Sequence, residues 1–279
     1  MSDFIGTKYK ILGVNVDVMD QNLLTQTIKS KVLAKQKTVI FTPYSEFIYR
    51  ATVDPRFLNI LNSADVSLAD GVFIQIASLY YETVNKTNSQ LLNFIKIIFL
   101  CVGMVARRIN RAIVFPQLLS GSTEVFTISD FAEKNNFSIG MIGGSQNVVY
   151  RAAQNLEKQY PGLKISVKLA GKAFSVDDKK TLDEIDFKKP DILFICYGAQ
   201  KQEKWIYEFK DKINANVIIG LGGTFDYLSG KKKLQSAWWS DHGLNWLHRL
   251  LSDPWRIKRQ TAIFKVMWKL AAEKTNPNE

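Results

Sequence analysis

Apolar runs of strand length alternate with helical patterns along this chain from Ile11 to about Gly220. The predicted strands cover residues 11–18, 38–41, 66–69, 137–142, 164–169, 191–196 and 217–220, and the predicted helices cover residues 21–34, 45–62, 71–81, 122–134, 147–159 and 202–212. This alternation is typical of a parallel sheet covered by helices. We therefore expect an α/β protein with a Rossmann-like parallel sheet flanked by helices, whose ligands bind at the carboxyl ends of the strands.

Two segments depart from this alternation and indicate how the chain is organised. Residues 85–120 are longer than an ordinary crossover and contain a predicted helix at 91–110, which we interpret as a helical insertion. Beyond Gly230 the strand pattern stops, and helices are predicted at 241–251 and 254–273. We expect a body of residues 1–230, with its insertion at about 85–120, followed by a helical, basic C-terminal appendage of residues 231–279.

The positive charge of the chain is concentrated in these two segments. The formal net charge is +11, and residues 91–120 (four Lys/Arg, no acid) and 231–279 (ten Lys/Arg, four acids) together supply +10. Five of the six tryptophans fall between Trp238 and Trp268. Cations interleaved with aromatic residues suit an anionic membrane surface, where rings settle at headgroup level and cations meet phosphates. We expect a membrane partner and no nucleic-acid partner.

The predicted helix 254–273 combines charge with an apolar stripe. Arg256 and Arg259 are three residues apart and share a face, while Ile263, Met267 and Leu270 form the stripe. A helix of this kind could rest on lipid while closing over an active site. The alternative is a terminal helix packed on the protein with solvated charges.

A membrane-crossing segment is not expected. The longest apolar run, residues 91–106, is broken by Asn93 and Lys96 and is shorter than the roughly 20 residues that a spanning helix needs. Residues 1–10 hold no apolar stretch of signal-peptide length. Cys101 and Cys196 are far apart, which favours neither a disulfide framework nor a zinc site. We expect a cytoplasmic protein that associates peripherally with the inner face of the membrane.

Candidate catalytic residues follow two of the predicted strands. Asp70 comes directly after strand 66–69, and an acid at the carboxyl end of a strand is well placed to act as a general base. Thr42 follows strand 38–41 and should reach the same edge of the sheet. From the local sequence alone, Asp70 could instead cap the next helix, and Thr42 could be ordinary loop polarity beside a Ser45 N-cap.

Small and polar residues in three further loops are candidates for ligand binding. Gly143 and Gly144 open a helix whose first N–H groups can hold a phosphate, unless they form only a tight turn. Gln202 and Glu203 fall in a first helical turn, where they can bond a nucleotide or sugar or simply follow the usual first-turn preference. The last loop contributes Thr224 and Asp226. So many such loops on one edge favour a nucleotide-type pocket.

Cofactor and metal motifs are missing from the sequence. Neither G-x-G-x-x-G nor G-x-x-x-x-G-K-[ST] occurs, which weakens dinucleotide and P-loop interpretations. There is no Asp-x-Asp pair, and His242 and His248 are six residues apart, which is not a metal-ligand spacing on a helix. We expect metal-independent chemistry with no cofactor.

Four segments, in this order and at compatible spacing, resemble a known family. They are Ala69-Asp70-Gly71, residues 198–203, residues 223–230, and residues 243–250 followed by 254–259. These segments resemble the WecG/TagA/CpsF glycosyltransferases, which make bacterial wall teichoic acid, capsule and enterobacterial common antigen intermediates. The resemblance covers about residues 11–259 without the insertion. It implies inverting transfer of an N-acetylhexosamine, typically N-acetylmannosamine from a UDP-sugar, to a polyprenyl-diphosphate-linked sugar.

The resemblance also implies roles for individual residues. Asp70 would deprotonate the acceptor hydroxyl, and Thr42 would help to position the substrate beside it. Gln202 and Asp226 would line the nucleotide-sugar pocket. Three appendage residues would hold the lipid diphosphate or the departing nucleotide, since an arginine fork pairs with two phosphate oxygens and keeps its charge: Arg249, Arg256 and Arg259.

The chain departs from the family pattern at positions around donor and acceptor recognition. Tyr44 stands where the family usually has Asn, Gln200 where it has Pro, Asn245 where it has Glu, and Thr123 where it has the Asp of a Gly-Ser-Asp triplet. An arginine common before that triplet is also missing. The identity of the transferred sugar therefore stays open, and an arginine of the insertion could take over the absent charge: Arg107, Arg108 or Arg111.

Two other functions are compatible with parts of the sequence. A nicotinamide-dependent oxidoreductase would share the expected fold but lacks its glycine fingerprint here. A non-enzymatic protein that binds a membrane surface would account for the basic segments alone. The sequence leaves open whether the chain forms a homo-oligomer.

Overall fold

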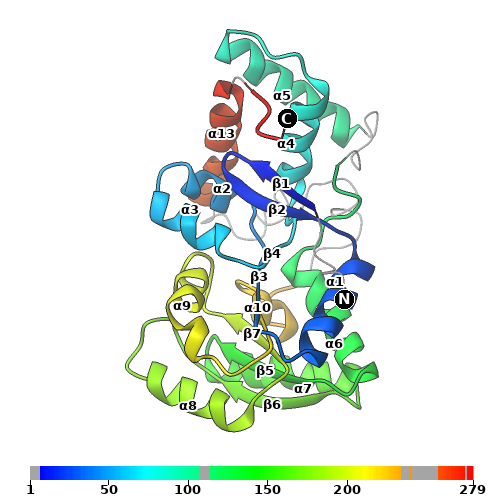
Figure 1. The fold of residues 1–279 in the computed structure, drawn as a ribbon, viewed down its shortest axis with the longest axis vertical. Helices are drawn as coiled ribbons and strands as arrows, with labels where there is room; N and C mark the ends of the chain where they lie inside the picture. The colour runs from blue at the N-terminus through cyan, green and yellow to red at the C-terminus, as the bar shows by residue number, and fades with distance from the viewer. Residues whose placement is uncertain (1–6, 107–113, 234–238, 240–256, 274, 279) are drawn as a thin grey trace.

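The computed structural model describes residues 7–106, 114–233, 239, 257–273 and 275–278. A β-sheet and its covering helices form one half of the molecule, and a layer of helices with a small hairpin forms the other (Figure 1). The confirmed α/β architecture places the sheet at the centre of the first half.

The main sheet has six strands, and every pairing in it is parallel. Its strands, in spatial order, are β4 (Val66–Ser67), β3 (Thr38–Phe41), β8 (Val217–Gly220), β7 (Ile192–Cys196), β5 (Ser138–Gly143) and β6 (Lys164–Leu169). Every residue of β3, β7 and β8 is buried, as expected for strands covered on both faces. The sequence prediction of a helix-covered parallel sheet is confirmed.

The prediction of a single strand at residues 11–18 was wrong. Residues 11–18 do not join the sheet; they belong to an antiparallel hairpin of β1 (Thr7–Ile11) and β2 (Val14–Val18). Leu12 and Gly13, with φ of 47° and 85°, form its two-residue turn. Positive φ at both central residues matches the twist of paired strands, and glycine adopts it without steric cost.

Helices cover both faces of the sheet. One face carries α1 (Gln21–Leu33), α6 (Gly121–Lys134), α7 (Gln146–Gln159) and α10 (Thr224–Leu228), whose buried side chains share a core with Ile40, Met141, Phe194 and Ile219. The other carries α2 (Ser45–Ala51), α3 (Pro55–Asn62), α8 (Asp178–Lys188) and α9 (Lys201–Phe209), which pack with Val39, Phe41, Leu193 and Ile218.

The connections reverse sides between two neighbouring strands. β5 leads into α7 on one face, whereas the adjacent β7 leads into α9 on the other. In open α/β sheets, ligands bind beyond the carboxyl ends of strands at such a switch point. The loops that follow β5 and β7 therefore occupy a topologically favoured binding position.

Two helix predictions for the body of the chain differ from the structure, and one of its helices was not predicted. The predicted helix 45–62 is two helices, because Asp54 accepts a hydrogen bond from the N–H of Phe57 and Pro55 starts α3. The predicted helix 202–212 ends at Phe209 and continues as a short 3₁₀ turn. The helix α8 was missed because only Thr181 and Ile185 on it are buried, which leaves little apolar periodicity.

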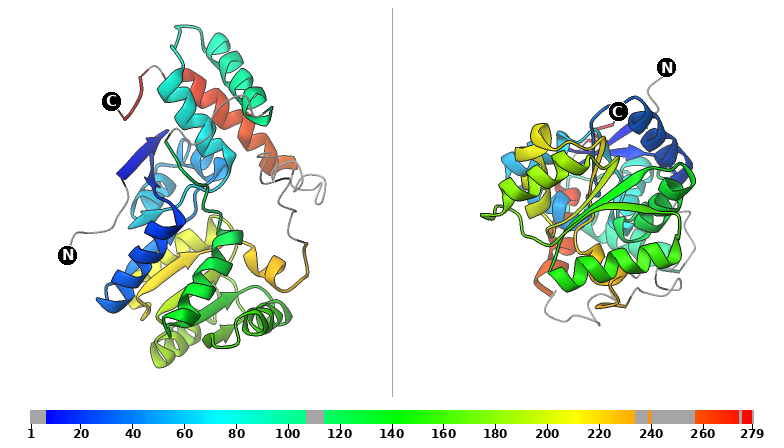
Figure 2. Two further views of the ribbon diagram at one scale, coloured as in Figure 1. Left: turned by 90° about the vertical axis from the view of Figure 1, so that its right-hand side faces the viewer. Right: turned by 90° about the horizontal axis from the view of Figure 1, so that it is seen from below.

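A helical layer lies beyond the sheet and includes one described helix from each of the two segments that departed from the alternation. It contains α4 (Val72–Thr83), α5 (Gln90–Val105) and α13 (Ile257–Ala272), with α13 packed against α2 and α5 (Figures 1 and 2). The predicted helix 241–251 lies outside the described residues. Among the described helices, none has the length and apolarity needed to cross a membrane.

The apolar stripe of the last helix faces the protein. Met267 and Leu270 are buried, and Ile263 is partly buried against the same core. The expectation that this stripe rests on lipid was therefore wrong, and the packed alternative holds for this face. The stripe faces inward because α2 and α5 offer apolar partners for it.

Candidate active site

Asp70 and Thr42 leave neighbouring parallel strands at the same edge of the sheet. Asp70 follows β4 and is partly exposed, and its backbone N–H donates a hydrogen bond to the carbonyl oxygen of Pro43, at 3.3 Å. The N-cap position of α4 is Gly71, not Asp70. The carbonyl of Ala69 accepts a hydrogen bond from the N–H of Leu119, at 2.9 Å, which brings the segment before α6 to the same edge.

Thr42 connects this edge to the central strand β8. Its buried hydroxyl donates to the carbonyl oxygen of Gly220, at 3.4 Å. A side chain on Gly121 would lie 3.6 Å from the Thr42 hydroxyl. The start of α6, the end of β3 and the end of β8 therefore meet around Thr42.

Gln202 and Glu203 hold the loop that follows β8. The Gln202 Oε1 accepts a hydrogen bond from the N–H of Gly222 at 2.8 Å, and its Nε2 donates to Glu203 Oε1 at 2.7 Å. Both side chains are buried. Thr224, also buried, donates from its hydroxyl to the carbonyl of Leu221 at 2.6 Å. These residues stabilise the loop by bonds inside the protein.

The Glu203 carboxyl is fully buried, which is unusual for an ionisable group. It is 0% exposed, and its Oε2 has no hydrogen-bond partner among the residues that the structure describes. Burial raises the pKa of Glu203 to about 7, although the hydrogen bond from Gln202 opposes the shift. At neutral pH this carboxyl is therefore divided between its protonated and ionised forms.

We expect replacement of Glu203 by Gln to change how stability depends on pH. A carboxyl whose pKa is higher in the folded state makes folding less favourable once it ionises. The loss of folding free energy caused by ionising Glu203 is absent below the ordinary pKa of 4.5. It grows as the pH rises to about 7 and is complete above that pH. The difference in unfolding free energy between variant and parent should therefore shift by about 3 kcal/mol in favour of the variant between pH ~4 and pH ~8.

Urea unfolding of the two proteins across that pH range measures this shift. Lys134, an exposed residue, offers a matched control: Lys134→Gln should leave the pH profile nearly unchanged, because exposed ion pairs contribute little. If the unfolding free energies of Glu203→Gln and the parent changed with pH in the same way, the raised pKa of Glu203 would be contradicted.

A second buried acid, which the sequence analysis missed, lies near Asp70. Glu124 of α6 is 2% exposed and accepts a hydrogen bond from Gln21 Nε2, at 3.3 Å. Burial raises the pKa of Glu124, hydrogen bonds from Gln21 and Thr123 lower it, and the negative charge of Asp70 raises it further. Its position directly after the Gly121-Ser122-Thr123 triplet was the available signal.

Two departures from the family pattern meet at one carboxylate. The Tyr44 hydroxyl donates to Glu46 Oε2 at 2.8 Å, and Gln200 Nε2 donates to Glu46 Oε1 at 3.0 Å. These bonds join the loop after β3 to the loop after β7, across the end of β8. Tyr44 and Gln200 were recognised separately from the sequence and Glu46 was not, because local sequence does not reveal a bond between residues 154 positions apart.

Gly143 and Gly144 lie at the switch point between β5 and β7. Gly143 has φ of 121°, and a Cβ there would lie 2.4 Å from the carbonyl oxygen of Cys196. Gly144 is exposed, and its carbonyl accepts a hydrogen bond from the N–H of Gly171 at 3.1 Å. The backbone therefore requires glycine at 143 whether or not a phosphate binds, which favours the tight-turn alternative at that residue.

The remaining predicted site residues are Asp226 and three arginines of the C-terminal appendage. Asp226 is in the first turn of α10, partly exposed, with its Oδ1 3.3 Å from Lys231 Nζ. Arg249 and Arg256 lie outside the described residues, and Arg259 is in α13 with its side chain undescribed. Within the residues that the structure describes, no three or more His, Cys, Asp or Glu side chains are grouped to hold a metal ion.

Comparison with known proteins adds a family and named relatives. The model of the Glycosyl transferase WecG/TagA/CpsF family matches residues 9–100 and 97–279. N-acetylglucosaminyldiphosphoundecaprenol N-acetyl-beta-D-mannosaminyltransferase of Bacillus subtilis is 27% identical over 263 residues, which cover 94% of this chain and 86% of the relative. The protein of that name in Staphylococcus aureus is 26% identical over 270 residues, or 96% of this chain and 93% of the relative.

Proposed function

The chain belongs to the glycosyl transferase WecG/TagA/CpsF family, and we propose that it transfers N-acetylmannosamine or a related hexose from UDP to a polyprenyl-diphosphate-linked sugar. It is a glycosyltransferase by family. The acceptor is proposed because the names of the Bacillus and Staphylococcus relatives specify a sugar on undecaprenyl diphosphate. The product would enter cell-wall, teichoic-acid or capsule polysaccharide synthesis.

The observation that carries this proposal is the position of Asp70. A partly exposed carboxylate stands at the carboxyl edge of a parallel sheet, tied by its own N–H to the loop that bears Thr42. An ionised carboxylate in such a place can accept the proton of a sugar hydroxyl. Asp70 then acts as the general base, and Thr42 helps to position the substrate beside it.

The proposed reaction is a single displacement. The acceptor hydroxyl oxygen forms a bond to the anomeric carbon of the donor sugar as the bond from that carbon to the UDP oxygen breaks. The hydroxyl proton passes to Asp70, and the electron pair of the broken bond leaves with UDP. Attack from the face opposite the leaving group inverts the anomeric configuration.

The developing charge on UDP requires positive partners. We assign this role to Arg249, Arg256 and Arg259 from their family positions, since an arginine fork can bond two phosphate oxygens at once. No metal is needed if these arginines neutralise the diphosphate. We also propose that the nucleotide-sugar pocket is lined by Asp226, Gln202 and the Gly143-Gly144 loop. Glu203 would act through Gln202, to which it is hydrogen-bonded.

The acceptor places the enzyme at a membrane. A polyprenyl carrier remains in the lipid bilayer, so the protein must approach the headgroup region to reach the sugar. We propose a peripheral position on the cytoplasmic face, supported by the concentration of Lys and Arg in residues 91–120 and 231–279.

A transfer assay with a panel of UDP-sugars tests the function. With a short-chain polyprenyl-diphosphate N-acetylglucosamine acceptor, we expect UDP-N-acetylmannosamine or a related UDP-hexose to yield product without added metal. In thermal unfolding, UDP at a large excess over its dissociation constant should stabilise the protein by about 3 kcal/mol, whereas NAD should not. Stabilisation by NAD, with no product from any UDP-sugar, would instead favour an oxidoreductase.

A further inference from the structure

The helix α5 is apolar on the face that points away from the protein. Its inner face buries Ile97 and Met104, as in any packed helix. Its outer face exposes further apolar side chains, with Phe99 71% exposed, and these are Leu91, Leu92, Ile95, Phe99 and Val102. Soluble surface helices usually carry polar residues on that side, so a helix apolar all round normally lies in a core or in lipid.

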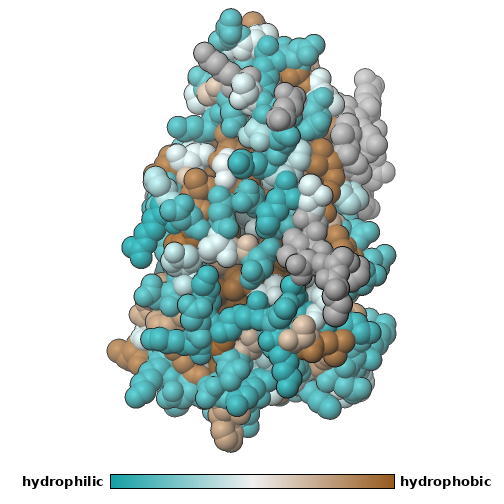
Figure 3. All heavy atoms as spheres, in the orientation of Figure 1, coloured by the Kyte–Doolittle hydropathy of each residue, from teal (hydrophilic) through white to brown (hydrophobic). Residues whose placement is uncertain are grey.

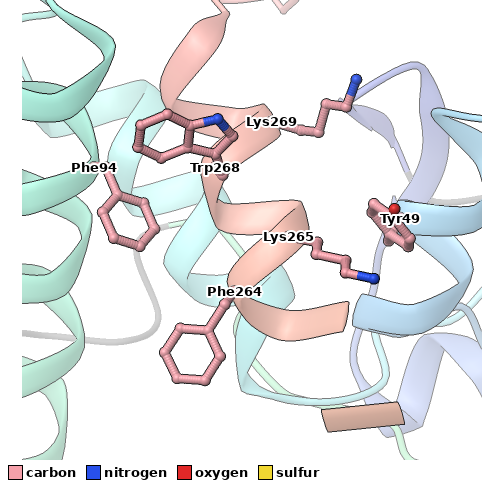
Figure 4. A pocket seen from close by; sticks show the side chains of 6 residues that line it. All are labelled: Tyr49, Phe94, Phe264, Lys265, Trp268 and Lys269. Atoms are coloured by element: carbon pink, nitrogen blue, oxygen red, sulfur yellow. The ribbon is translucent and has the colours of Figure 1, made fainter. Parts of the chain in front are cut away.

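The helix α13 adds exposed aromatic residues next to α5. Phe264 and Trp268 are one turn apart on its outer face, opposite the buried Val266 and Leu270. The rings of Phe94 and Trp268 meet edge to face, with centroids 5.4 Å apart, which joins the two helices (Figure 4). An open groove of about 460 Å³ lies here, lined by these rings, Phe264, Tyr49, Lys265 and Lys269.

The exposed apolar residues are concentrated on this pair of helices. Of the 14 large apolar side chains that are exposed in the described part of the chain, seven belong to α5 and α13. Figure 3 shows hydrophobic atoms among mostly hydrophilic ones at the end of the molecule where α5 lies. Contiguous apolar surface on a monomeric protein normally marks an interaction site.

The charges around these residues favour one kind of partner. The 16-residue helix α5 contains Lys96 and no acid, and α13 contains no acid either. Lys265 and Lys269 point to the side of the groove away from α5, where Lys265 Nζ lies 5.5 Å from the ring centroid of Tyr49 (Figure 4). Lysines beside apolar and aromatic side chains complement anionic headgroups over acyl chains.

We propose that the outer faces of α5 and α13 form a docking surface for an anionic lipid bilayer. This α5–α13 surface consists of Leu91, Leu92, Ile95, Phe99, Val102, Phe264, Lys265, Trp268 and Lys269. Its apolar side chains enter the headgroup boundary, and its lysines meet lipid phosphates. The inner stripe of α13 takes no part, because it is buried in the protein.

The surface is on the side of the sheet where the candidate active site lies. The helices α2 and α4 begin just after β3 and β4 end, and α13 packs on α2. Figures 1 and 2 both show α5 and α13 beyond that edge of the sheet. Docking there would bring the carboxyl ends of the strands toward the bilayer that holds the proposed acceptor. This orientation toward the acceptor rests on the proposed function.

Vesicle sedimentation tests the surface without any substrate. The full chain should sediment with vesicles containing phosphatidylglycerol, more weakly with phosphatidylcholine alone, and less at about 0.5 M salt. The double variant Ile95→Glu/Phe99→Glu and the single variant Phe264→Glu should each bind at least about ten-fold more weakly. The double variant Lys265→Gln/Lys269→Gln should lose binding to the anionic vesicles only.

A matched control is available at the opposite end of the molecule. Phe187 of α8 is 77% exposed, so Phe187→Glu makes the same chemical change far from α5 and should leave vesicle binding unchanged. All of these positions are exposed, and each variant should keep the thermal unfolding midpoint of the parent. Equal loss of binding in the Phe187 variant, or retained binding in the α5 and α13 variants, would overturn the proposal.

The experiment also distinguishes a bilayer from a second copy of the chain. Sedimentation velocity should give the same oligomeric state for the parent and the variants. A parent dimer that dissociates in the α5 variants, with vesicle binding unaffected, would show that another protomer covers the surface and would overturn the proposal. Because the vesicles contain neither donor nor acceptor, failure of the proposed transfer reaction would leave the vesicle result unchanged.

Discussion

Replacing Asp70 by Asn should lower kcat by about 10²–10⁴-fold, because an amide cannot accept the proton of the acceptor hydroxyl. The substitution keeps the size and polarity of the side chain, and the bond to Pro43 uses the backbone N–H of residue 70, which the variant retains. Folding and UDP affinity should therefore stay near those of the parent. Initial rates at saturating donor and acceptor, with thermal unfolding in the presence of UDP, measure both properties.

Asp54→Asn is a suitable control for this variant. It makes the same chemical change at an acid that caps α3, and Asn caps a helix about as well as Asp does. Its turnover should match that of the parent. Near-normal turnover of Asp70→Asn would remove Asp70 from the role of base. A large fall in its unfolding midpoint would instead assign Asp70 a structural role.

The parallel sheet could be predicted because its signal is local. Strands such as Ile192–Cys196 and Val217–Gly220 are buried on both faces, so they are continuous apolar runs between turns. The hairpin was misjudged for a related reason. Its strands are also rich in Val and Ile, and only the short Leu12-Gly13 turn separates them from a single long strand.

The positions of Asp70 and Thr42 at one edge followed from topology. The carboxyl ends of parallel strands lie together, so residues that directly follow β3 and β4 must be neighbours. The partners of buried side chains do not follow from topology. The bond between Gln21 and Glu124 joins residues 103 positions apart, and the bond between Gly222 and Gln202 depends on how two loops pack.

The last helix illustrates a different limit. Its sequence showed an apolar stripe, but periodicity alone does not say what the stripe contacts. The structure buries Met267 and Leu270 against the protein and exposes Phe264 and Trp268, which the stripe did not include. An amphipathic pattern therefore predicted the helix correctly while the assignment of its faces required the neighbouring helices α2 and α5.

Gly143→Ala should destabilise the protein by about 3–5 kcal/mol, from two causes that add. A φ of 121° is strained for any residue with a side chain, and the new Cβ would lie 2.4 Å from the backbone oxygen of Cys196, which cannot move without disturbing β7. Variants at two other glycines, Gly198 and Gly223, distinguish the effect of the strained φ from that of the close contact. Gly198 has φ of 90° with open space around it, so Gly198→Ala should cost about 1–2 kcal/mol from strain alone.

Gly223→Ala completes the series, because Gly223 has neither a positive φ nor a neighbour within 4 Å and should change stability by less than about 1 kcal/mol. Urea unfolding of the three variants gives the order directly. If Gly143→Ala were no worse than Gly198→Ala, the close approach of β5 to Cys196 would be relaxed in solution, and glycine at 143 would need another explanation. Phosphate binding by this loop would then become the stronger interpretation, since it is the alternative that its sequence left open.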